Sequence, residues 1–270
     1  MMDRRSPRFY AQLAFTLVVC AFLVVPVVMS VLAGLSQNYF IGVKSGLTLR
    51  WIGVVLSSYS GSIGLSLQIA LACLAATLVL GVPMAYVLAR HPSRVTRLFE
   101  ELLVLPVAVP GLATALALIL LYGEWRGFRA SWLFILVGHV VFTLPFMVRS
   151  VLAVMAAMDL VTLEEAAASL GAGFAKRFFG VIVPNARYGI LAGALMVVTL
   201  SVGEFNITWM LHTPLTKTIP VGLADSYASL RLEIGSAYTI VFFVMIVPLL
   251  VAMQWFAREP TPARPRLHGR

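Results

Sequence analysis

Long apolar runs are the feature of this sequence that most constrains its fold. A helix needs about 20 apolar residues to cross the hydrocarbon core of a bilayer, and six runs of the chain reach that length. Only 11% of the residues are charged, whereas a soluble domain carries about 25%. We therefore expect an all-α, polytopic membrane helix bundle, with six transmembrane helices at residues 12–35, 61–89, 98–122, 131–155, 189–211 and 236–256.

The polar segments around these runs define the regions of the chain. Residues 1–11 are expected to form an N-terminal tail, and residues 12–256 form the transmembrane domain. Residues 257–270 are rich in Pro and Arg, and this composition predicts a disordered C-terminal tail. Within the transmembrane domain, residues 156–188 form a long and partly polar segment between two apolar runs.

The basic residues predict how the chain is oriented in the membrane. Fourteen Lys and Arg residues lie on the side that holds both termini and residues 156–188, and six lie on the other side. Because the side richer in Lys and Arg faces the cytoplasm, both termini and this segment are expected there, in a cell inner membrane. The chain also lacks the interleaved aromatic and basic residues that nucleic-acid grooves use. Nucleic acid is therefore not expected as a partner, despite the net charge of +9.

Neither the cysteines nor the lysines fit a metal, disulfide or nucleotide site. Cys20 and Cys73 are the only cysteines, and both lie inside apolar runs without metal-ligand spacing. A phosphate-binding loop needs Gly directly before Lys, but the residues before the three lysines are Val43, Ala175 and Thr216. We therefore expect no metal, no cofactor and no enzymatic activity of this chain, ATP hydrolysis included.

Residues 156–188 predict a helix, a glycine and a second short helix. Thr162 and Glu165 fit a capping box at the start of the first helix, and Glu164 and Glu165 suit the positive end of its dipole. Gly171 is suited to end this helix in a left-handed conformation. The helix between these ends carries small residues with high helix propensity, namely Ala166, Ala167 and Ala168.

The second helix of this hairpin is expected to be short and amphipathic. Its apolar face is predicted to hold Phe174, Phe178 and Phe179, and Pro184 is expected to end it. A hairpin with a small-faced, acidic first helix can lie deep in a groove on another protein. On the residues alone, a hairpin that re-enters the membrane interface is an equally good interpretation.

The same segment resembles the EAA motif of bacterial ABC importer permeases. That motif reads Glu-Ala-Ala, three residues, Gly, nine residues, Ile, one residue, Leu and Pro. The matching residues are Glu165, Ala166, Ala167, Gly171 and Pro184, while Val181 and Val183 stand where Ile and Leu are usual. Residues 81–90, 144–149 and 218–222 also resemble these permeases. Residues 201–205 resemble the fifth-span signature of sulfate, molybdate, iron and phosphonate permeases, where polyamine permeases have an acidic variant.

This resemblance implies a type I ABC importer permease with a MetI-like fold. It implies three kinds of protein partner: an ABC ATPase dimer, a second permease subunit, and a periplasmic or lipid-anchored substrate-binding protein. In that family the hairpin is the coupling helix, which docks in a cleft of the ATPase. The implied coupling residues are Glu164, Glu165, Ala166, Ala167, Gly171 and Pro184. The solute stays open among polyamines (spermidine or putrescine), phosphonates, iron and oxyanions such as sulfate.

Polar residues and prolines inside the predicted spans mark a candidate translocation pathway. Ionisable residues are costly at this depth and therefore indicate function. Glu204 and His139 are such residues, although a structural or gating role for Glu204 is the favoured interpretation. The candidate pathway residues are Glu204, Asn206, Thr208, His139, Pro106 and Pro110. An alternative function is a proton-coupled secondary transporter that uses Glu204 and His139, but this alternative leaves the hairpin unexplained.

Overall fold

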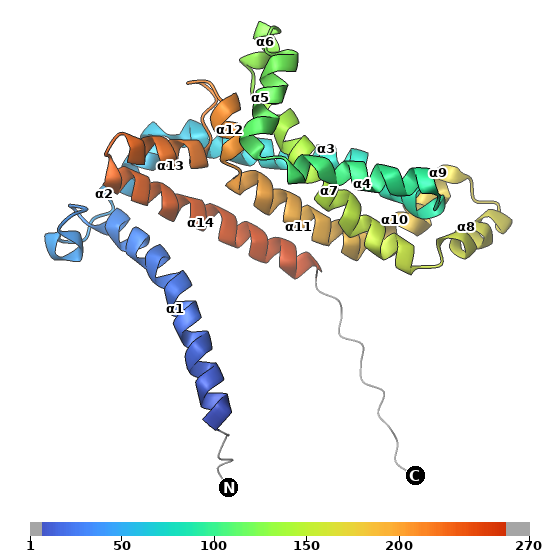
Figure 1. The fold of residues 1–270 in the computed structure, drawn as a ribbon, viewed down its shortest axis with the longest axis horizontal. Coiled ribbons are helices and arrows are strands. Elements are labelled where there is room, and N and C mark those ends of the chain that lie inside the picture. Colours follow the sequence, from blue (N-terminus) through green and yellow to red (C-terminus); the bar gives the residue numbers. More distant parts are fainter. Residues whose placement is uncertain (1–6, 258–270) are drawn as a thin grey trace. The chain divides into compact units, whose positions relative to one another are not determined.

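The structure is a computed structural model that describes residues 7–257, and the described chain is all-α (Figure 1). Besides helices, residues 7–257 contain one isolated antiparallel bridge, between Ser36 and Leu47. Within residues 7–257, four uninterrupted helices are long and apolar enough to cross a membrane, and the number rises to six if each of two bent pairs counts as one span. The four are α1 (Pro7–Leu35), α3 (Ser60–Arg90), α7 (Trp132–Ala157) and α14 (Leu232–Ala257).

The third predicted span is not a single helix. It consists of α4 (Arg94–Ala108) and α5 (Gly111–Tyr122), which are bent by 102° relative to each other. Proline lacks a backbone N–H and disfavours helical geometry in the residue before it, and Val109, which precedes Pro110, is extended with φ −83° and ψ 132°. The span predicted over residues 98–122 is therefore a bent pair of helices rather than one continuous helix, and Pro110 explains the break.

The fifth predicted span is also interrupted. Helix α11 (Arg187–Gly203) ends where Glu204 adopts an extended conformation, with φ −70° and ψ 121°. A separate short helix, α12 (Asn206–Leu211), follows. The segment predicted as a span over residues 189–211 therefore consists of two helices instead of one. The remaining helices are η1 (Gly42–Ser45), α2 (Arg50–Ser58), α6 (Arg126–Arg129), α8 (Leu160–Ser169), α9 (Phe174–Arg177), η2 (Phe178–Ile182), α10 (Val183–Asn185) and α13 (Ile219–Ala228).

The chain divides into two compact units, of which the first comprises residues 1–64 and 217–245. Its core joins α2, α13 and the N-terminal part of α14. A Cβ atom added to Gly34 of α1 would lie 2.8 Å from the backbone of Ser236 and Ala237. The backbones of α1 and α14 therefore touch directly, as small residues allow in membrane bundles. The buried core residues are Val55, Ile219, Ala237, Tyr238 and Val241.

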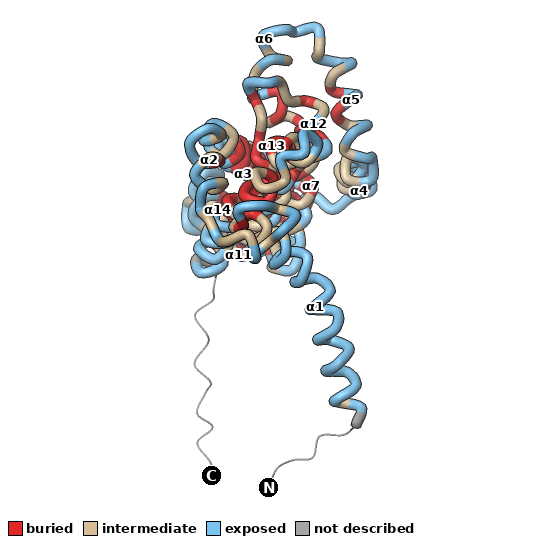
Figure 2. The backbone as a smooth tube through the Cα atoms, turned by 90° about the vertical axis from the view of Figure 1, so that its left-hand side faces the viewer, coloured by how far each residue is buried: buried red, intermediate tan, exposed pale blue. Residues whose placement is uncertain are grey.

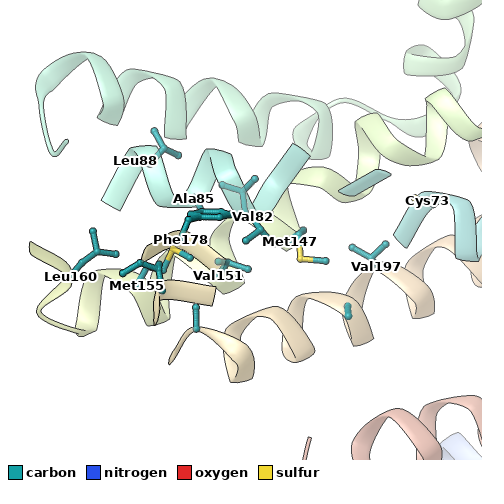
Figure 3. Packing of buried hydrophobic residues seen from close by; sticks show 14 residues of the cluster. Cys73, Val82, Ala85, Leu88, Met147, Val151, Met155, Leu160, Phe178 and Val197 are labelled. Atoms are coloured by element: carbon teal, nitrogen blue, oxygen red, sulfur yellow. The ribbon is translucent and has the colours of Figure 1, made fainter. Parts of the chain in front are cut away.

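The second unit comprises residues 65–216 and 246–270. In it, α7 packs along α11 through Gly189 and Gly193, which form a GxxxG pair. A Cβ atom on either glycine would lie 2.8 Å from an atom of α7, the carbonyl oxygen of Ser150 or the sulfur of Met147. Figure 3 shows the larger apolar cluster of this unit, to which α3, α7, α8, η2 and α11 contribute.

The described chain begins and ends within helices. Helix α1 begins at Pro7, so residues 7–11 of the predicted N-terminal tail are helical. Along most of α1 the residues are exposed (Figure 2), as is expected for a helix that borders lipid or another protein. The remaining residues of the predicted N-terminal tail, 1–6, and residues 258–270 of the C-terminal tail lie outside the described residues.

Candidate functional site

Helix α8 begins earlier than the sequence pattern indicated. Asp159 is its N-cap, and the Asp159 carboxylate accepts hydrogen bonds from the Thr162 backbone N–H at 3.3 Å and from the Thr162 hydroxyl at 2.7 Å. The predicted capping box of Thr162 and Glu165 was therefore wrong, because a carboxylate three residues upstream caps the helix. Glu164 and Glu165 consequently lie in the second turn rather than at the positive end of the dipole.

The end of α8 agrees with the prediction. Gly171 has a φ of +80°, which is the left-handed conformation expected for it. The Gly171 N–H donates to the Ala168 carbonyl at 2.9 Å, and the Ala172 N–H donates to the Ala167 carbonyl at 3.1 Å. These two bonds form a Schellman motif. A glycine is required here because a residue with a Cβ adopts this φ only with strain.

One face of α8 is open and small. Glu165, Ala166 and Ala168 are exposed in this chain, whereas Ala167 is half-buried. Glu164, in contrast, is buried against the rest of its unit and is only 4% exposed. Helix α8 therefore has an acidic and alanine-rich outer face, and it is attached to the rest of its unit through its inner face.

The second helix of the hairpin differs from its prediction in two respects. Phe178 is buried and its ring stacks with that of Phe174 at 6.0 Å, but Phe179 points away and is 69% exposed. Pro184 does not end the helical path, which runs through the π-helix η2 and on to Asn185. The break falls one residue later, at Ala186, and the chain bends there by 71° into α11.

Glu164 binds two side chains at the end of α3 that faces the hairpin. The Tyr86 hydroxyl donates to Glu164 Oε1 at 2.5 Å, and Arg90 Nε donates to Glu164 Oε2 at 2.6 Å. Burial alone would raise the pKa of the Glu164 carboxyl, but these hydrogen bonds and the charges of Arg90 and Arg177 hold the pKa below its ordinary value. Glu164 is therefore ionised at neutral pH.

A second polar cluster lies where α11 breaks. His139 of α7 is 1% exposed, and its Nδ1 and Nε2 atoms form hydrogen bonds of 2.8 Å with the hydroxyls of Ser201 and Thr208. Glu204 Oε2 lies 3.7 Å from His139 Nε2. The structure thus brings together three of the six predicted pathway residues, His139, Glu204 and Thr208.

Glu204 lies one residue before Phe205, the N-cap of α12, and its side chain caps the start of that helix. Its two carboxylate oxygens accept hydrogen bonds of 2.9 Å from the backbone N–H groups of Ile207 and Thr208. At the other end of α12, Arg129 Nη1 donates to the Leu211 carbonyl at 2.7 Å. A negative group at the N-terminus and a positive group at the C-terminus both stabilise a helix dipole, so this six-residue helix is held at both ends by charge.

The other three predicted pathway residues lie outside this hydrogen-bonded group. Asn206 is exposed. Pro110 is the N-cap of α5. The next residue, Gly111, packs against α12, since a Cβ atom added to Gly111 would lie 3.2 Å from the Cβ atom of Asn206. Pro106 instead lines an apolar hollow of about 740 Å³ between α3, α4 and α7.

Sequence reasoning missed four residues of these two sites. The Asp159 carboxylate accepts from the hydroxyl of Thr162, which lies three residues later. This spacing is typical of an N-cap, so the sequence did contain a signal for it. Tyr86 and Arg90 are four residues apart and therefore share a helix face, so their proximity was visible although their partner was not. Ser201 lies in the stretch 201–205 that was singled out, but only the structure places it against His139.

The chain is similar to known proteins over most of its length. Residues 77–261 match the family model described as "Binding-protein-dependent transport system inner membrane component". The sulfate transport system permease protein CysW of Synechocystis sp. is 30% identical over 208 residues, which cover 72% of this chain and 75% of that protein. The putrescine transport system permease protein PotI of Escherichia coli is 28% identical over 253 residues, which cover 88% of this chain and 87% of that protein.

Two further similarities concern molybdenum transport and a solved structure. The molybdenum transport system permease protein ModB of Escherichia coli is 28% identical over 210 residues, which cover 72% of this chain and 91% of that protein. A chain of the inward-facing MetNI methionine ABC transporter superposes with a TM-score of 0.57. This superposition covers 73% of the present chain and 91% of the other at 16% identity, and it shows a shared fold.

Proposed function

The chain belongs to the family of binding-protein-dependent inner membrane transport components, the permease subunits of ABC importers, and from this we propose that its α8 hairpin is the docking element for the ATPase. This function accounts for the hairpin, whereas a proton-coupled secondary transporter would not need one. The observation that carries the proposal is the form of α8: a capped, short helix with a small exposed face that ends in a Schellman motif at Gly171.

The outer face of α8 has the properties of a surface that inserts into a groove. Alanine side chains allow close approach of another backbone, and Ala166 and Ala168 are open to such an approach. Glu165 is exposed beside them and can meet a basic residue of the ATPase. Glu164 and Pro184 belong to the support of the hairpin, since Glu164 is buried and Pro184 lies in α10 behind it.

We expect Ala167→Trp and Gly171→Val to separate the permease from its ATPase. The tryptophan adds bulk where the helix must fit closely, and valine at Gly171 adds strain of roughly 1 kcal/mol or more because φ is +80°. No atom lies within 4 Å of a Cβ built on Gly171, so the strain comes from the backbone and not from a clash. The measurement is the amount of ATPase that co-purifies with each variant at matched permease levels, together with transport.

Gly173→Ala is the matched control for this experiment. Gly173 follows in the same loop with an extended conformation, φ −66° and ψ 167°, and no atom lies within 4 Å of its Cβ position. This variant should retain the ATPase at the level of the unmodified chain. Normal ATPase retention and normal transport in both Ala167→Trp and Gly171→Val would contradict the docking role.

The remaining components of the transporter follow from the same assignment. A pair of permease subunits, a pair of ATPases and a separate binding protein would complete it, with both termini and α8 on the cytoplasmic side. Cysteine labelling checks this orientation: Ser45→Cys in η1 should react with an impermeant reagent outside intact cells, and Ser6→Cys should not. Reaction of Ser6→Cys under these conditions would contradict the orientation.

The solute is proposed to be a small ion that a binding protein delivers. The relatives are named for sulfate, putrescine and molybdenum transport, so oxyanions and polyamines are the first candidates, with phosphonates and iron beside them. Sulfate, molybdate, putrescine, spermidine, a phosphonate and ferric iron should be tested for thermal stabilisation of the binding protein that serves this permease. The compound that raises its Tm identifies the class, and a panel without any effect would contradict this range of solutes.

The cluster around Glu204 is proposed to hold the pathway in shape rather than to bind the solute. Both Glu204 oxygens are occupied by the N-terminal N–H groups of α12, and both His139 nitrogens are occupied by hydroxyls. Groups that are satisfied in this way have little capacity left for a passing ion. Asn206, which is exposed beside the cluster, is the better candidate for contact with the solute.

A further inference from the structure

We propose that Glu164, Tyr86 and Arg90 form a clamp that transmits movement of α8 to α3, and hence couples ATP hydrolysis to the opening of the pathway. This inference rests on the proposed function, because it takes α8 as the element that the ATPase moves. It assigns to these three side chains a positioning role in energy coupling that is distinct from docking. The clamp consists of the Glu164 carboxylate of α8 and of the two donors from the C-terminal end of α3.

The geometry gives the clamp a rigid form. Each oxygen of Glu164 accepts one hydrogen bond, from the Tyr86 hydroxyl at 2.5 Å and from Arg90 Nε at 2.6 Å. Tyr86 and Arg90 are one helical turn apart, so both donors come from one face of α3. A carboxylate held by two donors on one rigid helix follows that helix, and hydrogen bonds to ionised groups are the strong class.

Apolar contacts surround the carboxylate of the clamp and shield it from solvent. The Tyr86 ring meets the Phe178 ring edge-on, with 5.2 Å between their centroids. Phe178 and Leu160, which both come from the hairpin, are 6% and 4% exposed and belong to the same cluster as Ala85 of α3 (Figure 3). The side chain of Glu164 is 5% exposed, against 30% for Arg90. An ion pair in such surroundings is screened weakly by salt.

Arg177 of α9 supplies a second positive charge near Glu164. Its charge helps to lower the pKa of Glu164, and its Nε atom is buried without a hydrogen-bond partner. A buried carboxylate that loses its only cation is strongly destabilised. Because Arg177 belongs to the hairpin itself, its charge stays near Glu164 when α8 moves and helps to keep the carboxylate ionised. The ionised carboxylate can therefore hold both donors of α3 while α8 moves.

A double-mutant cycle on the reconstituted transporter tests the clamp. The variants are Glu164→Gln, Arg90→Gln and the double variant, in complexes of permease, ATPase and binding protein in nanodiscs. The binding protein, loaded with the panel compound that stabilises it, serves as the probe. Two quantities are measured: the ATPase retained by the permease, and the stimulation of ATP hydrolysis by the binding protein.

We expect both single variants to retain the ATPase and to lose about tenfold in stimulation, as an interrupted buried ion pair should. The double variant should lose no more stimulation than the more impaired of the two single variants, because the effects of residues that act as one unit are not additive. Tyr86→Phe removes only one hydrogen bond and keeps the ring contact with Phe178, so its loss should be smaller. Glu101→Gln, an exposed glutamate of α4, is the control and should stimulate normally.

Each other result overturns the clamp in a recognisable way. Unchanged stimulation in Glu164→Gln and Arg90→Gln would show that α8 and α3 are coupled through other contacts. Additive losses in the double variant would show that the two residues act separately. Loss of the ATPase from Glu164→Gln would make Glu164 a docking residue. If a single variant does not fold, Tyr86→Phe decides alone, since normal stimulation there would contradict the clamp. Failure of the unmodified permease to bind the ATPase would instead contradict the proposed function.

Discussion

Two buried carboxylates organise this protein at the scale of single residues, and they do so through different partners. Glu164 accepts from two side chains of α3, so it ties the hairpin to a long helix. Glu204 accepts from two backbone N–H groups and thereby starts a helix in the middle of the bundle. The sequence indicated that Glu204 was unusual because of its depth, but the role of each carboxylate depends on partners that only the folded chain brings near.

Substitutions of Glu204 distinguish a helix cap from a charged group that binds the solute. The side-chain carbonyl of Gln can accept a hydrogen bond from one of the two backbone N–H groups, so Glu204→Gln should retain measurable transport. Leu cannot accept a hydrogen bond from either N–H group, and each buried group left unsatisfied costs about 1–3 kcal/mol of stability. Glu204→Leu should therefore lose transport and should also melt at a lower temperature. Transport and Tm of both purified variants check this expectation. Loss of transport in Glu204→Gln as complete as in Glu204→Leu would mean that the negative charge itself is required.

At the scale of helices, hydropathy predicted the uninterrupted spans well and the broken ones poorly. The predicted spans at 61–89, 131–155 and 236–256 agree closely with α3, α7 and α14. Hydropathy cannot detect a break, because the residues at a bend such as Val109 and Pro110 are as apolar as their neighbours. Proline alone does not decide the matter either, since Pro83 and Pro145 lie inside unbroken helices.

The close packing of α7 and α11 gives a prediction at this scale. A Cβ on Gly189 would lie 2.8 Å from the Ser150 carbonyl oxygen, which is backbone and cannot move aside. Gly189→Ala should therefore destabilise the protein by about 1–3 kcal/mol although alanine favours a helix. Gly203→Ala is the control on the same helix, since no atom lies within 4 Å of its Cβ position. The measurement is Tm in detergent, and equal Tm values for the two variants would contradict the packing.

At the scale of the whole molecule, the sequence predicted the class of protein and its membrane character. The EAA-like stretch in residues 165–184 and the apolar runs led to the ABC importer permeases, and the family model and the relatives confirmed that assignment. The division into two compact units was not predicted. Unit one joins residues 1–64 to residues 217–245, and contacts across such a separation depend on tertiary packing that local patterns do not encode.

The central claim is that this chain moves its solute with energy from ATP hydrolysed by a partner. Uptake into proteoliposomes that contain the permease, the ATPase and the loaded binding protein tests it most directly. Uptake should require ATP inside the vesicles and the binding protein outside, and it should persist when a protonophore removes the proton gradient. Uptake that follows an imposed proton gradient without ATP, and that stops with the protonophore, would contradict the account and favour a proton-coupled transporter.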